Sequence, residues 1–280
     1  MVGVASMLAA FEIRRLLPHF LTPTVIKLPY FEWLPLMPGG SVWAFILVWV
    51  LAAMAFVIGW KTRIAGAVLA CVIGYSLLLD QQLYSNHLYL LFLIVMLLTI
   101  ADSGAAISID ARQAERATIA GWPIWLLKAQ VSIVYIFSAI AKLTPQYLSG
   151  EVLTESLKHY GFFTVPMAWR VPVAMKLLAI VAIVMELFVG LGLWSRRLRP
   201  VAVIAGVLFH TFIIAALDSS RLSLSIFALE MFAVYLLFFD DTPGETGTTP
   251  VGHPRSKNLP TQNKTPTFAV RLSLKSLKNA

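Results

Sequence analysis

Long apolar runs separated by short polar segments dominate this chain. A helix needs about 20 apolar residues to cross a bilayer core, and seven runs reach or approach that length. They cover residues 42–59, 64–79, 87–101, 122–143, 171–194, 200–217 and 222–239. The third run is short, and we expect it to be tilted or partly re-entrant. The pattern predicts an all-α fold, a polytopic transmembrane helix bundle with about seven apolar spans.

The first 20 residues follow a less regular pattern. Their apolar stretch is interrupted by Glu12, Arg14 and Arg15 and is followed by Pro18. It has no clear cleavage motif after a basic start, so we do not interpret it as a signal peptide. Two alternatives stay open, a short interfacial helix and a shortened first span.

Composition supports a membrane protein. Hydrophobic residues make up 59% of the 280 residues, and the mean hydropathy is +0.79, whereas soluble domains are roughly half apolar. The single cysteine, Cys71, lies inside an apolar run and leaves the redox compartment undecided. We therefore expect the lipid bilayer as a partner and no nucleic acid, although the net charge is +8.

The basic residues fall in alternate loops, which predicts an orientation. Cations lie in the loops at 61–63, 112–116 and 196–199 and in the tail 241–280. These segments are predicted to be cytoplasmic, and the opposite loops exocytoplasmic or lumenal. The domain is predicted to cover residues 1–240, and the basic tail 241–280 is predicted to be disordered.

One apolar segment, residues 129–150, carries a polar stripe. Positions three and four apart share a helix face, and the stripe consists of Lys128, Ser132, Tyr135, Ser138 and Lys142. Such a stripe should face protein or a wet cavity rather than lipid. Lys142, just before Pro145, is the residue where we expect chemistry, because a desolvated pocket favours the neutral amine that a base requires. The alternative is that Lys142 extends to the outer headgroups.

Other polar residues interrupt the apolar runs. Asn86 and His87 stand at the start of one run, on the same predicted outer side as Lys142, while Glu186, His210 and Glu230 lie inside later runs. Interhelical hydrogen bonds or a mutual ion pair explain such residues without catalysis. The sequence contains no phosphate-binding glycine loop, paired-cysteine metal motif or nucleophile elbow, and no metal site is predicted.

Four segments together carry a resemblance to a known family. They read YSNHLYL, SIDARQ, IVYIFSAIAKLTPQYLSG and FHTFIIAALDSSRLSLSIF. In this order they resemble the vitamin K-dependent gamma-carboxylase family and its short relatives, the horizontally transferred transmembrane (HTTM) domain proteins. The resemblance runs from about residue 24 to residue 239.

This resemblance implies a membrane-embedded, quinol-dependent carboxylase or epoxidase reaction of the lyase class. Lys142 matches the family lysine that acts as base toward reduced vitamin K or another quinol, with oxygen and carbon dioxide as co-substrates. His87 matches the histidine that would hydrogen-bond the quinol or a developing oxyanion, and His210 matches a supporting histidine. Tyr135, Ser138 and Asn86 are the candidate cofactor-binding residues.

Two departures from the family pattern change the expected substrate. The segment after the lysine reads KLTPQY rather than a KLD.DW-like sequence, and no counterpart of the long lumenal domain of the animal carboxylases follows. We therefore do not expect a propeptide-guided protein carboxylase, and the acceptor substrate is unknown. A proton- or solute-handling transporter using Glu186, His210 and Glu230, and a noncatalytic membrane component, stay open as alternatives.

Overall fold

The computed structural model describes residues 1–20, 26–101, 109, 121–160, 171–216 and 221–239. Over these residues the chain forms helices and no strand. The α-helices are α1 (Val2–Phe20), α2 (Val42–Ile58), α3 (Thr62–Leu79), α4 (Asn86–Ile100), α5 (Gly121–Ala141), α6 (Pro145–Leu148), α7 (Glu151–Tyr160), α8 (Pro172–Gly192), α9 (Arg199–Ala216) and α10 (Arg221–Phe238). Two short 3₁₀ helices, Gly39–Ser41 and Gln81–Leu83, precede α2 and α4.

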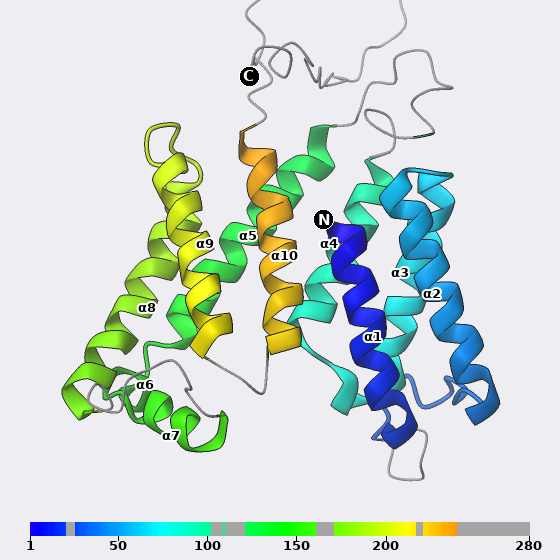
Figure 1. Ribbon diagram of the computed structural model, residues 1–280, viewed down its shortest axis with the longest axis horizontal. Helices are drawn as coiled ribbons and strands as arrows, with labels where there is room; N and C mark the ends of the chain where they lie inside the picture. Colours follow the sequence, from blue (N-terminus) through cyan, green and yellow to red (C-terminus); the bar gives the residue numbers. More distant parts are fainter. Residues whose placement is uncertain (21–25, 102–108, 110–120, 161–170, 217–220, 240–280) are drawn as a thin grey trace, which may run out of the picture.

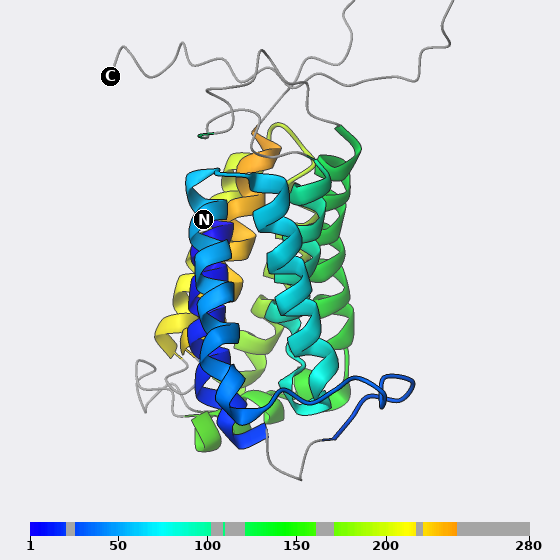
Figure 2. The same ribbon diagram turned by 90° about the vertical axis from the view of Figure 1, so that its right-hand side faces the viewer.

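The long helices stand side by side, and the short α6 and α7 lie at one end of the bundle (Figures 1 and 2). Five helical segments are long and apolar enough to cross a membrane, and Asn86–Ile100 and Leu222–Phe238 are shorter apolar helices. These seven elements correspond to the seven predicted runs, so the predicted all-α membrane bundle is confirmed. The chain is an integral multi-pass membrane protein.

Helix α1 is part of the bundle. It packs against α2, α4 and α10 and stands parallel or antiparallel to them rather than across their ends (Figure 1). Ala5, Ala9 and Ile13 are fully buried on its inner face, and the Trp49 indole of α2 donates a 3.0 Å hydrogen bond to the Ser6 hydroxyl. The structure therefore packs this segment along the bundle, although α1 is not among the helices long and apolar enough to cross a membrane.

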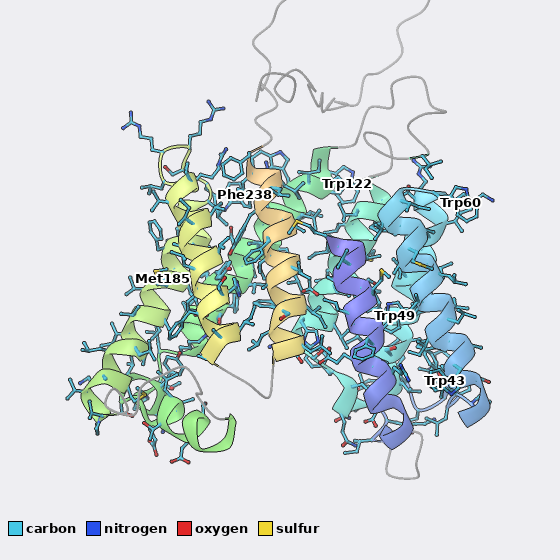
Figure 3. All side chains as sticks on the ribbon, viewed as in Figure 1. Trp43, Trp49, Trp60, Trp122, Met185 and Phe238 are labelled. Atoms are coloured by element: carbon cyan, nitrogen blue, oxygen red, sulfur yellow. The ribbon has the colours of Figure 1, made fainter. Side chains whose placement is uncertain are left out.

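The outward faces of the helices are apolar. Phe137, Val173 and Leu208 are each more than 60% exposed, as expected for lipid-facing positions. Exposed tryptophans lie at both ends of the bundle, Trp43 at one and Trp60 and Trp122 at the other (Figure 3). Tryptophan favours the headgroup level of a bilayer, so these residues mark the two membrane boundaries.

His87 and Lys142 lie at the same end of the bundle. Helix α4 begins and α5 ends at the end where α6 and α7 lie, opposite the basic loop that joins α8 to α9 (Figure 1). Which end is cytoplasmic stays a prediction. The basic residues at 112 and 116 and the tail 241–280 lie outside the described residues.

Candidate functional site

Lys142 lies one residue beyond α5, where the chain turns away from the helix. Its backbone N–H donates a 3.2 Å hydrogen bond to the Ala139 carbonyl oxygen, which closes a tight turn. Pro145 then begins α6, and the Thr144 hydroxyl caps that helix by accepting from the Tyr147 N–H. Because proline suits the first turn of a helix but not the interior of one, this sequence ends α5 and starts a new helix within a few residues.

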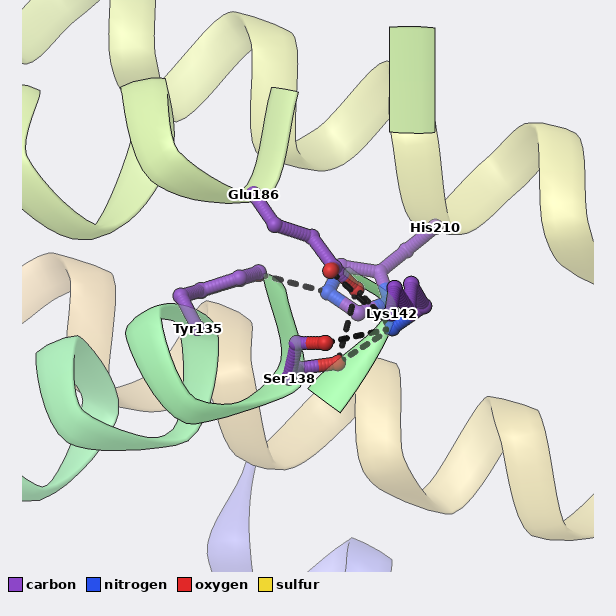
Figure 4. Close-up of polar contacts among 5 residues, drawn as sticks. All are labelled: Tyr135, Ser138, Lys142, Glu186 and His210. Carbon is purple, nitrogen blue, oxygen red and sulfur yellow. Dashed lines mark hydrogen bonds and ion pairs between the residues drawn. The ribbon is translucent and has the colours of Figure 1, made fainter. Parts of the chain in front are cut away.

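The Lys142 side chain turns inward to an acidic partner on α8 (Figure 4). Its Nζ donates to both carboxylate oxygens of Glu186, at 2.9 Å and 3.0 Å. The Ser138 hydroxyl lies between the two groups, accepting from Lys142 and donating to Glu186 at 2.9 Å. The Glu186 side chain is 7% exposed and that of Lys142 is 24% exposed. A carboxylate buried to this degree requires a partner, and Lys142 with Ser138 supplies it.

Tyr147 covers the outer side of this ion pair. Its ring centroid lies 5.9 Å from Lys142 Nζ, close enough for a cation–π attraction. Burial, followed by the negative charge of Glu186, raises the pKa of Tyr147 to about 12. The phenol is therefore a neutral hydrogen-bonding group throughout the physiological pH range.

A cavity of about 480 Å³ opens beside the pair. Its walls come from α6, α7, α8 and α9, and are lined by Lys142, Tyr147, Leu153, Leu178, Val181, Ala182, Met185, Glu186, Phe209, Phe212, Ile213 and Ala216. Most of these side chains are aliphatic or aromatic, and the ion pair with Tyr147 forms the polar part. Small-molecule sites commonly combine apolar walls with a few polar groups in this way.

A second hydrogen-bonded group lies deeper on the same face of α5. The Tyr135 hydroxyl lies 2.7 Å from His210 Nε2 on α9 and also contacts the Tyr235 hydroxyl on α10. All three side chains are at least 96% buried. Gly206 allows this approach, because a Cβ at that position would collide with the Tyr235 ring and hydroxyl. The network fixes α5, α9 and α10 relative to one another next to the cavity wall at Phe209.

His87 contacts a different set of helices. Its Nε2 lies 2.8 Å from Glu12 Oε2 of α1, and the other oxygen of Glu12 accepts from the Ser223 hydroxyl of α10. Asn86 is exposed at the first residue of α4. The structure thus joins Ser138 to Lys142 and Tyr135 to His210, and it pairs His87 with α1. His87 therefore contacts Glu12, whereas Lys142 contacts Glu186.

The predicted orientation of the polar stripe agrees with these contacts. Ser132 accepts a 2.7 Å hydrogen bond from the Trp194 indole, Tyr135 and Ser138 face protein, and Lys142 borders the cavity. On the opposite face Ile133, Phe137 and Ile140 are about half exposed or more. Helical spacing was therefore sufficient to find the inward face of α5.

Several residues of the site were not identified from sequence. Glu186 was recognised as a buried acid, but its pairing with Lys142 was not predicted, and Tyr147, Tyr235 and Glu12 received no role. The available signal was a single acid, Glu186, in an otherwise apolar run. Such an acid requires a partner, but the sequence does not identify that partner. Within the part of the chain that the structure describes, no group of three or more histidine, cysteine or acidic residues could hold a metal ion.

Comparison with known proteins gives one match and one negative result. The family model of the HTTM domain matches residues 1–242. No solved structure matches the chain.

Proposed function

Because this chain belongs to the HTTM domain family, whose membrane domain is related to the gamma-carboxylases, we propose that it is a quinol-dependent, oxygen-using enzyme of the carboxylase or epoxidase type. The observation that carries the proposal is the Lys142–Glu186 ion pair at the polar part of a largely apolar cavity. Reduced vitamin K or another quinol is the proposed cofactor. Oxygen and carbon dioxide are the proposed co-substrates, and the acceptor substrate is not assigned.

The residues of the cavity fit a quinol. Its ring carries hydroxyl groups and its substituents are apolar, so a ring near Lys142 and Tyr147 would leave the apolar part against Met185, Phe209 and Phe212. Tyr147 offers a hydroxyl group that donates or accepts hydrogen bonds at the same end, and Ser138, engaged by Lys142 and Glu186, holds those two groups beside it. When bound, the quinol supplies the reducing equivalents for the reaction with oxygen.

Lys142 and Glu186 together form the proposed base. A lysine accepts a proton only as the neutral amine, and the 2.9 Å contact allows Lys142 Nζ to pass one proton to Glu186. The neutral amine would then be placed to accept a hydroxyl proton from a quinol held in the cavity, which would leave Lys142 cationic and Glu186 protonated. The pair thus gains one proton, and Ser138 keeps both groups aligned during the transfer.

His210 and Tyr135 support the site from one helix turn deeper. Their 2.7 Å contact holds α5 against α9, and Phe209, next to His210 in the chain, lines the cavity. We assign them the role of fixing the cavity wall. His87 contacts Glu12 rather than this arrangement, and Asn86 precedes it in α4. A direct role for either residue requires that it reach the cofactor from α4.

Replacement of Lys142 tests the proposal. The Lys142→Ala protein should fold, because the apolar faces of the bundle are intact, but should lose quinol-dependent oxygen consumption by about 10²-fold or more. A small exogenous amine should restore part of the activity, with rescue that rises with amine basicity. Lys176→Ala is the matched control, since Lys176 is exposed on α8 at the same end of the bundle. Full quinol turnover in the Lys142→Ala protein would eliminate Lys142 as the base.

Mass spectrometry of the purified protein provides an independent test. We expect a quinone to copurify with the unaltered protein. Replacement of Met185 by the larger tryptophan should lower the amount of bound quinone, which would locate the ligand in the cavity. Continuous transport of protons or solutes without quinol turnover would instead favour the transporter alternative.

A further inference from the structure

Glu230 is the most unusual polar residue of the bundle outside the cavity. It is 0% exposed, and neither of its carboxyl oxygens has a hydrogen-bond partner in the part of the chain that the structure describes. An ionised carboxylate in such surroundings is very unfavourable, and unpartnered buried polar atoms are rare enough to call for an explanation. A carboxyl group that carries its own proton avoids the cost of the buried charge, which is the larger of the two costs.

The position of Glu230 connects it with the Glu12–His87 pair. Ser223 contacts Glu12, and Glu230 follows Ser223 by seven residues, so it lies on the same face of α10 about 10 Å further along. Glu12 is also the charged group that acts electrostatically on Glu230. Two carboxylates that interact in a nonpolar region cannot both be ionised without a cation.

These groups differ in their access to solvent. The side chains of His87 and Glu12 are 10% and 15% exposed, whereas Glu230 is completely enclosed. The pair is therefore the outer part of the cluster and Glu230 is the inner part. The three helices α1, α4 and α10 contact one another around it.

We propose that Glu12 and His87 form the entrance, and Glu230 the internal acceptor, of a proton-uptake site between α1, α4 and α10. When Glu230 lacks its proton, the His87 ring takes a proton from water and delivers it from Nε2 to Glu12 across the 2.8 Å contact. The proton then moves from Glu12 to the Glu230 carboxylate, so that Glu12 is ionised again, and a change of the His87 tautomer returns a proton to Nε2 and restores the pair. No hydrogen bond joins the two acids, and this last step requires a bridging water or rotation of a side chain.

A proton fits this cluster better than a metal cation. Hard metal cations take six or more oxygen ligands, whereas both oxygens of Glu12 are already engaged by His87 and Ser223. Within this cluster, the two oxygens of Glu230 are the ones without a hydrogen-bond partner among the described residues. This site is separate from the cavity and goes beyond the proposed quinol reaction.

Other titratable groups lie on the helices that pack against α10. Arg14 is directed toward Phe11 and Trp43, and Lys128 lies over Phe238, two turns beyond Glu230. The titratable groups of the neighbouring helices and of α10 itself also include Glu12, His87, Tyr89, Tyr135, Arg199, His210, Arg221 and Tyr235.

Infrared spectroscopy of the full chain in lipid nanodiscs tests the assignment, since protonated carboxyl groups absorb apart from carboxylates. At neutral pH the unaltered protein should show a protonated-carboxyl band that is lost in Glu230→Gln and kept in Glu151→Gln, an exposed acid on α7. After mixing with D₂O, the deuterium shift of this band should be slowed about tenfold or more in His87→Leu. If His87→Leu does not fold, Glu12→Gln replaces it in this experiment and should slow the deuterium shift to a similar extent.

Three results would overturn the proposal. A band that persists in Glu230→Gln would show that the proton is held elsewhere. Unchanged exchange in both entrance variants would remove Glu12 and His87 from the path. Loss of the band on addition of sodium at constant pH would identify a metal cation as the ligand instead.

Discussion

The Lys142–Glu186 pair and the His87–Glu12 pair, both among the described residues, differ in what lies beside them. Lys142 and Glu186 join α5 to α8 next to a cavity of about 480 Å³. His87 and Glu12 join α4 to α1, next to a third acid that has no hydrogen-bond partner. In both pairs the acid is bound by a basic residue and by a serine hydroxyl, Ser138 in one and Ser223 in the other.

This difference shows that an ion pair between helices does not define a function by itself. Opposite charges inside a bundle mainly compensate the cost of their own burial. A cavity beside the pair provides space for a ligand, whereas an unpartnered acid beside the pair provides a destination for a proton. The predictions below therefore alter each pair and the group next to it.

The largest effect is expected at Glu186. Glu186→Gln keeps the size of the side chain and one accepting oxygen but cannot store the proton that Lys142 must release. Quinol-dependent oxygen consumption should fall by about 10²-fold or more, with the larger change in kcat than in KM. Glu12→Gln should reduce turnover less, because Glu12 contacts other helices. Equal losses in the two variants would mean that both pairs serve one reaction.

A smaller effect is expected from separating the other pair. His87→Leu leaves Glu12 with Ser223 alone, and loss of a hydrogen bond to a charged group should lower the free energy of unfolding by about 1–3 kcal/mol. Denaturant titration in mixed micelles measures this loss. The double variant His87→Leu with Glu12→Leu should recover part of it, because no unpaired charge is left. An additive double variant would argue against direct coupling of the pair.

Replacement of Glu230 should act in the opposite direction. Glu230→Met removes a carboxyl group whose oxygens have no partner and supplies an unbranched side chain of similar length. The free energy of unfolding should increase by about 1 kcal/mol, whereas Glu186→Met should decrease it. A decrease for Glu230→Met would reveal a stabilising partner of this acid. Comparison of the two variants in the same denaturant titration distinguishes a paired acid from an unpartnered one.

The smallest effect is a pH dependence at Tyr147. Its folded-state pKa of about 12 lies above the ordinary value of 10.0, because burial and then Glu186 oppose the phenolate. The contribution of this group to stability is therefore present below pH 10 and is lost as the pH rises through about 12. In an ultraviolet absorbance titration, the part of the phenolate signal that appears near pH 12 in the unaltered protein should be smaller by one tyrosine in Tyr147→Phe. Titration of that tyrosine near pH 10 would indicate an open site.

The sequence was sufficient for the elements because each depends on local spacing. The seven apolar runs identified the long helices other than α1, and the polar stripe identified the face of α5 that contacts protein. Whether helix α1 crosses the membrane was ambiguous from the sequence, because Glu12 and Arg14 are charged and their partners could not be predicted. In the structure Glu12 has partners on α4 and α10, which explains how a charged residue is accommodated there.

The pairings could not be predicted because they depend on how distant helices pack. Lys142 and Glu186 are 44 residues apart, and Glu12 and His87 are 75 residues apart. A rotation of one helix by one residue would direct either acid elsewhere. The sequence named Glu186, His210 and Glu230 as one group of buried polar residues, whereas in the structure each of them belongs to a different local environment.

The walls of the cavity also bear on how its ligand must be measured. Val181 and Phe212 line the cavity, yet they are 53% and 46% exposed on the lipid-facing surface. A ligand that dissolves in the bilayer therefore approaches this wall from the membrane, where its concentration is a mole fraction of lipid rather than a molarity in water. An apparent Kd expressed per volume of buffer would change with the amount of lipid in the assay, and the same Kd expressed per lipid molecule would stay constant.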